Sequence, residues 1–173
     1  AKVQIGNAVR NILRLYSIAD FQCEPHYQHQ NPAERRIQDV KKLCNQLMDR
    51  TGTPSKYWLL CLKFVTYLIN RLATEKLGWK TPLEQATGQV PEISALLAFR
   101  CWEPVYYSAN NGFPSTSPEK TGRWVGVADH QGDALTYLIL TDDTNQVLAR
   151  SSVHSALDPN NPNLRAEAPL STT

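Results

Sequence analysis

Apolar residues recur at helical spacing through the first half of the chain. Residues 3–15 show this spacing briefly, and the stretch after Asn31-Pro32 repeats it as far as Gly52. Asn is a good helix N-cap and proline is favoured at the first helical position. Thr53-Pro54 repeats the start signal and opens a helix to about Leu72. The pattern predicts three helices, the last apolar nearly all round and buried on most sides.

The second half of the chain has a different pattern, with short strand-like stretches and many turn formers. The candidate strands are 105–107, 123–127, 134–140 and 147–153, with hairpin turns at 130–133 and 142–145. Residues 18–23 are a further short candidate strand, and 110–120 read as a long exposed loop. We therefore expect a small antiparallel sheet or barrel, separate from the helices.

Composition places the chain among ordinary soluble globular proteins, with 42% apolar and 20% charged residues. Its longest apolar run is too short to cross a bilayer, and the first residues lack a signal-peptide pattern, so we expect an intracellular protein without membrane contact. The cysteines, Cys23, Cys44, Cys61 and Cys101, form no CxxC pair and are expected to be reduced thiols.

Charge is distributed unevenly along the chain. Residues 1–80 hold 13 Lys and Arg against 6 Asp and Glu, whereas residues 81–173 hold 5 against 10. A basic half is typical of a protein that binds a polyanion, most commonly nucleic acid. A solvated helix face would give a similar count, so charge by itself leaves both interpretations open.

Glu34 stands at the head of the basic helix and has two interpretations. Asn31-x-x-Glu34 is a capping-box pattern, in which the carboxylate accepts a hydrogen bond from the Asn31 backbone. A catalytic carboxylate is the alternative. Nearby, Cys23, His26 and His29 could suggest zinc, but their spacing fits no common structural site and a fourth ligand is missing.

Three stretches of the sequence resemble copia-type retrotransposon integrases. Residues 29–36, HQNPAERR, resemble the segment around the third catalytic acid, although the family commonly has one more residue between Asn and Glu. Residues 80–101 match in order the stretch TPxExxTGxxPxxSxLxxFxC that follows the integrase core. Trp124-Val125-Gly126, Thr141-Asp142 and 147–153 are similar to the appended small SH3-like barrel.

The resemblance implies a fold of α/β plus all-β class. Residues 1–76 would be the helical C-terminal half of an RNase H-like integrase core whose first strands are missing. Residues 77–97 would be a linker with the TPxE motif, 98–155 a small antiparallel SH3-like β-barrel, and 156–173 a disordered tail.

The resemblance also implies a site and a chemistry. Integrases use two aspartates and a glutamate to hold two Mg²⁺ or Mn²⁺ ions for phosphoryl transfer, because hard cations prefer carboxylate oxygens. Glu34 would be the third acid and a metal ligand, and both aspartates are expected upstream of Ala1, so this fragment is expected to bind no ion and to be inactive in isolation. The expected nucleic-acid-binding residues are Arg35, Gln38, Lys41 and Lys42.

The predicted function is that of a fragment of a retrotransposon integrase, which carries out DNA 3′-end processing and strand transfer. Its partners would be the DNA of element ends and target, with a second copy of the chain in a homo-oligomer and no small-molecule substrate. Its location would be the nucleus or a cytoplasmic virus-like particle. The alternative is a non-enzymatic nucleic-acid-binding or structural remnant of a retroelement polyprotein.

Overall fold

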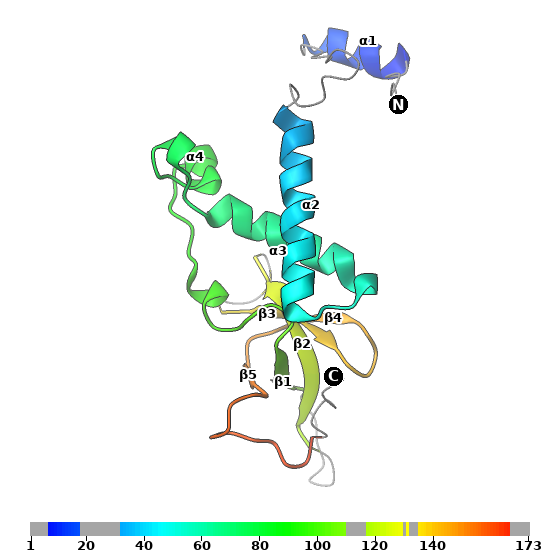
Figure 1. The fold of residues 1–173 in the computed structure, drawn as a ribbon, viewed down its shortest axis with the longest axis vertical. Helices are drawn as coiled ribbons and strands as arrows, with labels where there is room; N and C mark the ends of the chain where they lie inside the picture. The colour runs from blue at the N-terminus through cyan, green and yellow to red at the C-terminus, as the bar shows by residue number, and fades with distance from the viewer. Residues whose placement is uncertain (1–6, 18–31, 110–116, 130, 132–134, 167–173) are drawn as a thin grey trace. The chain divides into compact units, whose positions relative to one another are not determined.

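The protein has a mixed α/β fold, consisting of helices followed by a five-stranded antiparallel sheet (Figure 1). This computed structural model describes residues 7–17, 32–109, 117–129, 131 and 135–166. It divides into two compact units, Ala1–Lys42 and Leu43–Thr173. The predicted strand at 18–23, the zinc candidates Cys23, His26 and His29, and the Asn31 cap lie outside the described residues.

The first unit contains helix α1 (Asn7–Leu15) and the start of α2 (Pro32–Thr51). Both helices confirm the sequence prediction, and α2 begins at the expected proline. In α1 the apolar side chains Val9, Ile12 and Leu15 are 48%, 54% and 76% exposed. Their spacing of three residues places them on one side of the helix.

The second unit continues with a 3-10 turn, η2 (Ser55–Tyr57), and helix α3 (Trp58–Arg71). The predicted helix therefore begins directly after Thr53-Pro54 as a 3-10 turn, and the α-helix itself begins three residues later, at Trp58. The expectation that it is buried on most sides was wrong. Cys61, Phe64 and Val65 are its buried residues, whereas Trp58 is 54% exposed.

The TPxE motif starts a short helix, α4 (Pro82–Thr87), between the 3-10 turns η3 (Glu75–Leu77) and η4 (Ser94–Leu96). The Thr81 side chain accepts from the Glu84 backbone, and the Glu84 carboxylate accepts from the Thr81 backbone, which forms a capping box. Gly88 ends the helix with φ 75°, in the left-handed region that favours glycine. These motif residues therefore have a structural role, because Thr81 and Glu84 stabilise the start of α4 and Gly88 forms its end.

The sheet has five antiparallel strands in the order β4-β3-β2-β1-β5. The strands are β1 (Pro104–Ser108), β2 (Glu119–Val127), β3 (Tyr137–Thr141), β4 (Val147–Arg150) and β5 (Val153–Ser155). Two sequence predictions are corrected here. Residues 147–153, expected as one strand, belong to two, and residues 119–120, expected in a loop, begin β2.

The sheet is strongly curled, because its two edge strands are joined by only two residues. The Cα atoms of Arg150 and Val153 are three residues apart, so they lie within about 11 Å. In a flat sheet, four steps between neighbouring strands would separate β4 from β5 by about 19 Å. The opposite edges must therefore approach one another, as they do in a small barrel. Gly122 allows β2 and β3 to pack closely, since a Cβ there would lie 2.6 Å from Ile139 Cγ2.

The core of the second unit lies between α3 and the sheet. Trp124 is 0% exposed, and Phe64 of α3 meets its ring edge-on at a centroid distance of 5.2 Å. Phe99 packs against both Trp124 and Tyr137. Trp124, Tyr137 and Phe64 all belong to this core. Because Phe64 belongs to the same core, the sheet is not separate from the helices as expected.

Hydrogen bonds define the hairpin turn between β3 and β4 and hold part of the tail in place. The turn predicted at 142–145 joins β3 to β4, with the Asn145 backbone donating to the Thr141 carbonyl. The turn predicted at 130–133 lies largely outside the described residues. In the tail, which the sequence predicts to be disordered, Asn163 donates to Ser117 and Glu119, so the described residues 156–166 have specific contacts with the start of β2.

Candidate nucleic-acid interface and polar pocket

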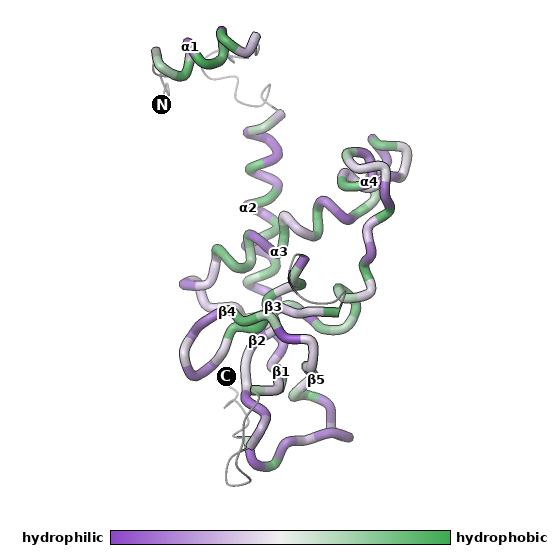
Figure 2. Tube along the Cα trace, turned by 180° about the vertical axis from the view of Figure 1, so that it is seen from behind, coloured by the Kyte–Doolittle hydropathy of each residue, from purple (hydrophilic) through white to green (hydrophobic). Residues whose placement is uncertain are grey.

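The predicted site residues in the first unit lie on one side of α2. A helix turns about 100° per residue, so Glu34, Arg35, Gln38, Lys41 and Lys42 fall within an arc of about 120°. Glu34 is half-buried, and the other four are exposed: Arg35, Gln38, Lys41 and Lys42. Figure 2 shows the hydrophilic character of this part of α2. We call these five residues the α2 face.

The α2 face combines three cations with one carboxylate. Glu34 lies in the first turn, where the positive end of the helix dipole favours a negative charge. Arg35, Lys41 and Lys42 give the face a net positive charge. Exposed cations of this kind attract a polyanion over a distance of about a Debye length and contribute little to folding. The geometry therefore suits phosphate binding.

Glu34 has no cluster of metal ligands around it in the part of the chain that the structure describes. Across those residues, no group of three or more His, Cys, Asp or Glu side chains could hold a metal ion. Asp39 is five residues after Glu34, which places it about 140° round the helix. Asp20 and Glu24 lie outside the described residues. A two-metal site would thus need carboxylates from elsewhere.

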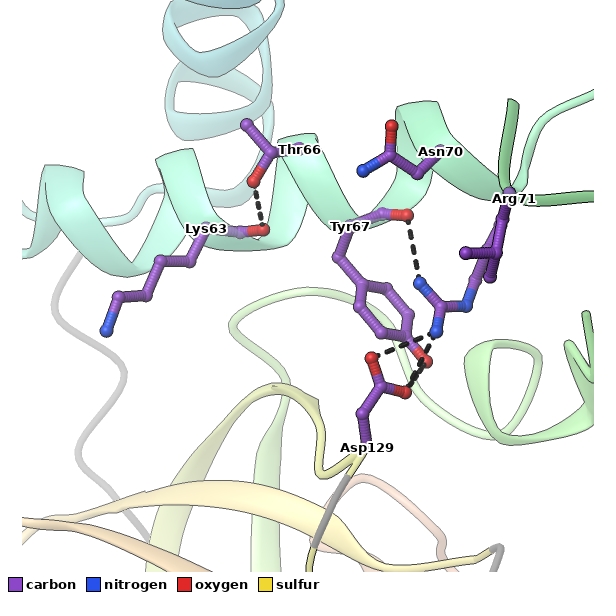
Figure 3. Close-up of a pocket in the computed structure, with 7 residues that line it drawn as sticks. Lys63, Thr66, Tyr67, Asn70, Arg71 and Asp129 are labelled. Atoms are coloured by element: carbon purple, nitrogen blue, oxygen red, sulfur yellow. Dashed lines mark hydrogen bonds and ion pairs between the residues drawn. The ribbon is translucent and has the colours of Figure 1, made fainter. Parts of the chain in front are cut away.

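A polar pocket of about 560 Å³ lies in the second unit, beside α3 (Figure 3). One side of α3, the short helix α4 and the loop after β2 contribute to it. Its lining residues are Lys63, Thr66, Tyr67, Asn70, Arg71, Leu83 and Asp129. Sequence reasoning did not find this site, because Arg71 and Asp129 are 58 residues apart.

Asp129 is the centre of the pocket's hydrogen bonds. Nη2 of Arg71 lies 2.9 Å from both Asp129 carboxylate oxygens, and the Tyr67 hydroxyl donates to Oδ1 at 2.9 Å. The Arg71 guanidinium also stacks over the Tyr67 ring, 3.5 Å from its centroid. Tyr67 is half-buried. Together these contacts fasten α3 to the loop after β2.

The arrangement raises the pKa of Tyr67 to about 12, first because burial disfavours the phenolate and then because its hydrogen bond to Asp129 favours the neutral phenol. Because the pKa is higher in the folded state, the protonated Tyr67 contributes to the stability of the fold. This contribution is fully present below the ordinary pKa of about 10 and is lost as the pH rises through 12. We expect Tyr67 to remain neutral at pH 10.5. A difference titration of tyrosinate absorbance between wild type and Tyr67→Phe measures this, and ionisation near pH 10 would contradict it.

We expect Asp129→Asn to destabilise the protein by about 1–2 kcal/mol, because a charged acceptor for Arg71 and Tyr67 is lost at a partly buried site. The side chains of Arg71 and Asp129 are 12% and 36% exposed. The matched control is Asp143→Asn, which breaks the exposed pair with Lys120 and should leave stability unchanged. Urea unfolding measures both variants, and equal effects would contradict a special role for Asp129.

The described cysteines lie close together, and their surroundings make them unreactive thiols. Cys44, Cys61 and Cys101 are free thiols, the first two buried. Burial raises the pKa of all three, that of Cys101 to about 12. Thiols rather than thiolates therefore predominate at neutral pH, and a thiol is a poor nucleophile. These side chains act as small hydrophobic groups around the start of α3.

Comparison with known proteins relates the chain to transposon polyproteins. Over 94 residues, 54% of this chain, it is 30% identical to the "Retrovirus-related Pol polyprotein from transposon RE2" of Arabidopsis thaliana. Over 87 residues, 50% of this chain, it is 28% identical to the "Retrovirus-related Pol polyprotein from transposon RE1" of the same plant. The matched segment spans 6% of the length of each relative. No protein-family model and no solved structure matches.

This similarity confirms the coarser part of the resemblance, which is a relation to retrotransposon Pol polyproteins. The described residues include no helix long and apolar enough to cross a membrane. Of the predicted site residues, the helix brings Glu34 to the same side as Arg35, Gln38, Lys41 and Lys42. Their roles in catalysis, metal binding and DNA binding stay predictions.

Proposed function

We propose that the chain is a segment of a copia-type retrotransposon integrase and that its α2 face binds DNA. The observation that carries the proposal is the shared side of α2, where one carboxylate in the first turn precedes exposed cations on the following turns. The similarity to Pol polyproteins supports it independently. The inherited reaction would be 3′-end processing and strand transfer.

Glu34 would supply one carboxylate to a site for two Mg²⁺ or Mn²⁺ ions, the third acid of the integrase triad. Its oxygen ligands suit hard cations, and such ions activate the attacking oxygen and stabilise the leaving oxygen in phosphoryl transfer. The described residues offer no complete ligand set. We therefore assign the remaining ligands to aspartates outside them, and activity to a longer chain that contains those aspartates.

The second unit would combine core helices with the SH3-like barrel. The curled sheet supports this assignment, because its edge strands are joined by two residues and a small barrel requires such an approach. The proposed partners are the element's DNA ends, the target DNA and a second copy of the chain. The proposed location is the nucleus or a virus-like particle.

The experiment that tests the proposal is a fluorescence anisotropy titration of a 30-base-pair DNA duplex at two salt concentrations. We expect binding that weakens steeply with salt, since each phosphate contact contributes about 0.9 to the slope of log K against log salt. Lys41→Gln with Lys42→Gln should lower this slope by about 2. The loss reflects two fewer phosphate contacts.

The matched control neutralises two exposed lysines of the second unit, Lys76→Gln with Lys80→Gln. It removes the same net charge but should leave the slope nearly unchanged. Equal losses in both double variants would show that the α2 face has no special part in binding. An absence of DNA binding at low salt would instead favour a structural remnant of a polyprotein.

A further inference from the structure

Three hydroxyl residues of the chain are followed directly by proline: Thr53, Thr81 and Ser117. Proline-directed protein kinases phosphorylate this dipeptide, because proline has no backbone N–H and so suits a cleft that offers no acceptor there. A basic residue at the third position after the hydroxyl residue completes the pattern. Lysine stands at this position for Thr53 and Ser117, whereas Thr81 has a glutamate there. The sequence pattern therefore leaves two candidates.

The structure separates these two candidates by their accessibility. Thr53 is only 7% exposed, and its hydroxyl group is hydrogen-bonded to that of Thr51 at 2.7 Å. Ser117 is half-buried just before strand β2, and both Pro118 and Lys120 are exposed. A kinase reaches this second segment by opening only the end of the β1–β2 ladder, and strand ends fray at little cost. Ser117 is therefore the accessible candidate.

The Ser117 hydroxyl group holds the tail against the start of β2. Its Oγ accepts hydrogen bonds from Asn163 Nδ2 at 3.2 Å and from the Glu119 backbone at 3.3 Å. The same Asn163 nitrogen also donates to Glu119 Oε2. On the tail side, Asn163 Oδ1 accepts from the backbone N–H groups of Arg165 and Ala166, each at 3.0 Å. We call Ser117, Glu119 and Asn163 the tail latch.

We propose that Ser117 is a phosphorylation site for a proline-directed kinase and that its modification opens the tail latch. Oγ attacks the γ-phosphorus of ATP and forms a new P–O bond, while the bond from that phosphorus to the β,γ-bridging oxygen breaks and ADP leaves. The hydroxyl proton passes to a carboxylate of the kinase. The product is a phosphoserine with a charge between about −1.5 and −2 at neutral pH.

The phosphate and the closed tail latch cannot occupy the same space. At 3.2 Å, the gap between Ser117 Oγ and Asn163 Nδ2 leaves no room for a phosphorus and three further oxygens. The Glu119 carboxylate accepts from the same nitrogen, so it lies beside the new negative charge and repels it. Lys120 is already paired with Asp143 at 2.8 Å. Phosphorylation therefore favours the departure of Asn163 from β2.

The proposal is independent of the proposed function, because neither the α2 face nor a metal ion has a part in it. Incubation of the full 173-residue chain with a cyclin-dependent kinase and ATP tests the site. We expect the transfer of one phosphate, which mass spectrometry of the digested protein places on Ser117. Pro118→Ala and Lys120→Gln should each slow the transfer about tenfold or more, since each removes a recognition contact.

The matched control is Asp143→Asn, which removes the ion-pair partner of Lys120 but keeps the whole recognition pattern. It should not slow phosphate transfer. The proposal is overturned if no phosphate is transferred, if Thr53 or Thr81 receives it in place of Ser117, or if Pro118→Ala is phosphorylated as fast as wild type.

Hydrogen exchange tests the opening of the tail latch separately. In the phosphorylated protein, the backbone N–H groups of Arg165 and Ala166 should exchange about tenfold faster or more, because their turn loses its anchor on β2. Asn163→Ala should exchange as fast without the kinase, and phosphorylation should add no further increase. The Trp124 N–H, which donates to Glu103 at 2.9 Å, should keep its protection.

Two results of the exchange experiment would overturn the proposal. Unchanged or slower exchange at Arg165 and Ala166 in the phosphorylated protein would show that the tail latch stays closed. Faster exchange at Trp124 to the same extent would show that the phosphate unfolds the sheet and does not act on the tail latch.

Discussion

Glu34→Gln is expected to reduce strand transfer at least about a hundredfold in a longer chain that contains the two aspartates of the proposed metal site. Catalytic metal ions contribute several kcal/mol to transition-state stabilisation, and each 1.4 kcal/mol corresponds to about tenfold in rate. Glutamine keeps the size of the side chain and its ability to accept a hydrogen bond, but removes the negative charge that a metal ligand needs. The measurement is strand transfer of a labelled element-end duplex in Mg²⁺.

The same substitution separates the catalytic role of Glu34 from a capping role. A capping glutamate replaced by glutamine keeps its hydrogen-bond acceptor, so activity should change little if capping is its whole purpose. Glu84→Gln is the matched control, because Glu84 caps α4 through its carboxylate. We expect normal strand transfer in that variant. Full activity in Glu34→Gln would remove Glu34 from the proposed metal site.

Trp124→Ala is expected to destabilise the second unit by about 3–5 kcal/mol, the usual range for deleting a buried aromatic side chain. The Trp124 side chain is completely buried between Phe64 of α3 and Phe99. Its removal leaves a cavity where helix and sheet meet, so both should lose stability together. Urea unfolding followed by far-ultraviolet circular dichroism measures the change.

Two controls distinguish the cavity from the loss of a tryptophan. Trp79→Ala removes the same side chain at a position that is 72% exposed, and should change stability by less than about 0.5 kcal/mol. Trp124→Phe keeps an aromatic ring and removes an indole N–H that has no partner among the described residues. It should cost much less than alanine. Equal losses at Trp124 and Trp79 would contradict the shared core of α3 and the sheet.

Local sequence signals predicted much of the fold. Pro32 begins α2, and the turn at 142–145 joins two strands, because caps and turns depend on residues within one or two turns of the chain. The side of α2 that carries Glu34 and Lys41 also follows from spacing alone. Helical periodicity is thus enough to define the candidate DNA-binding face.

These local signals could not predict contacts between segments that are distant in the sequence. The apolar pattern of α3 could not tell which side meets Trp124 and which side stays exposed. The pairing of Arg71 with Asp129 depends on the loop after β2 returning to α3. Neither is a property of a short window of sequence, because each arises when segments far apart in the chain pack together.

The sequence by itself determined where helices and turns begin, which residues line the α2 face, and the relation to retrotransposon polyproteins. Only the tertiary structure decided that residues 147–153 divide between opposite edges of a curled sheet, that Phe64 joins α3 to that sheet, and that a pocket forms around Asp129. The physical reason is the separation along the sequence over which each kind of interaction acts. Caps and periodicity act within a few residues, whereas sheet closure and core packing depend on which distant surfaces bury one another.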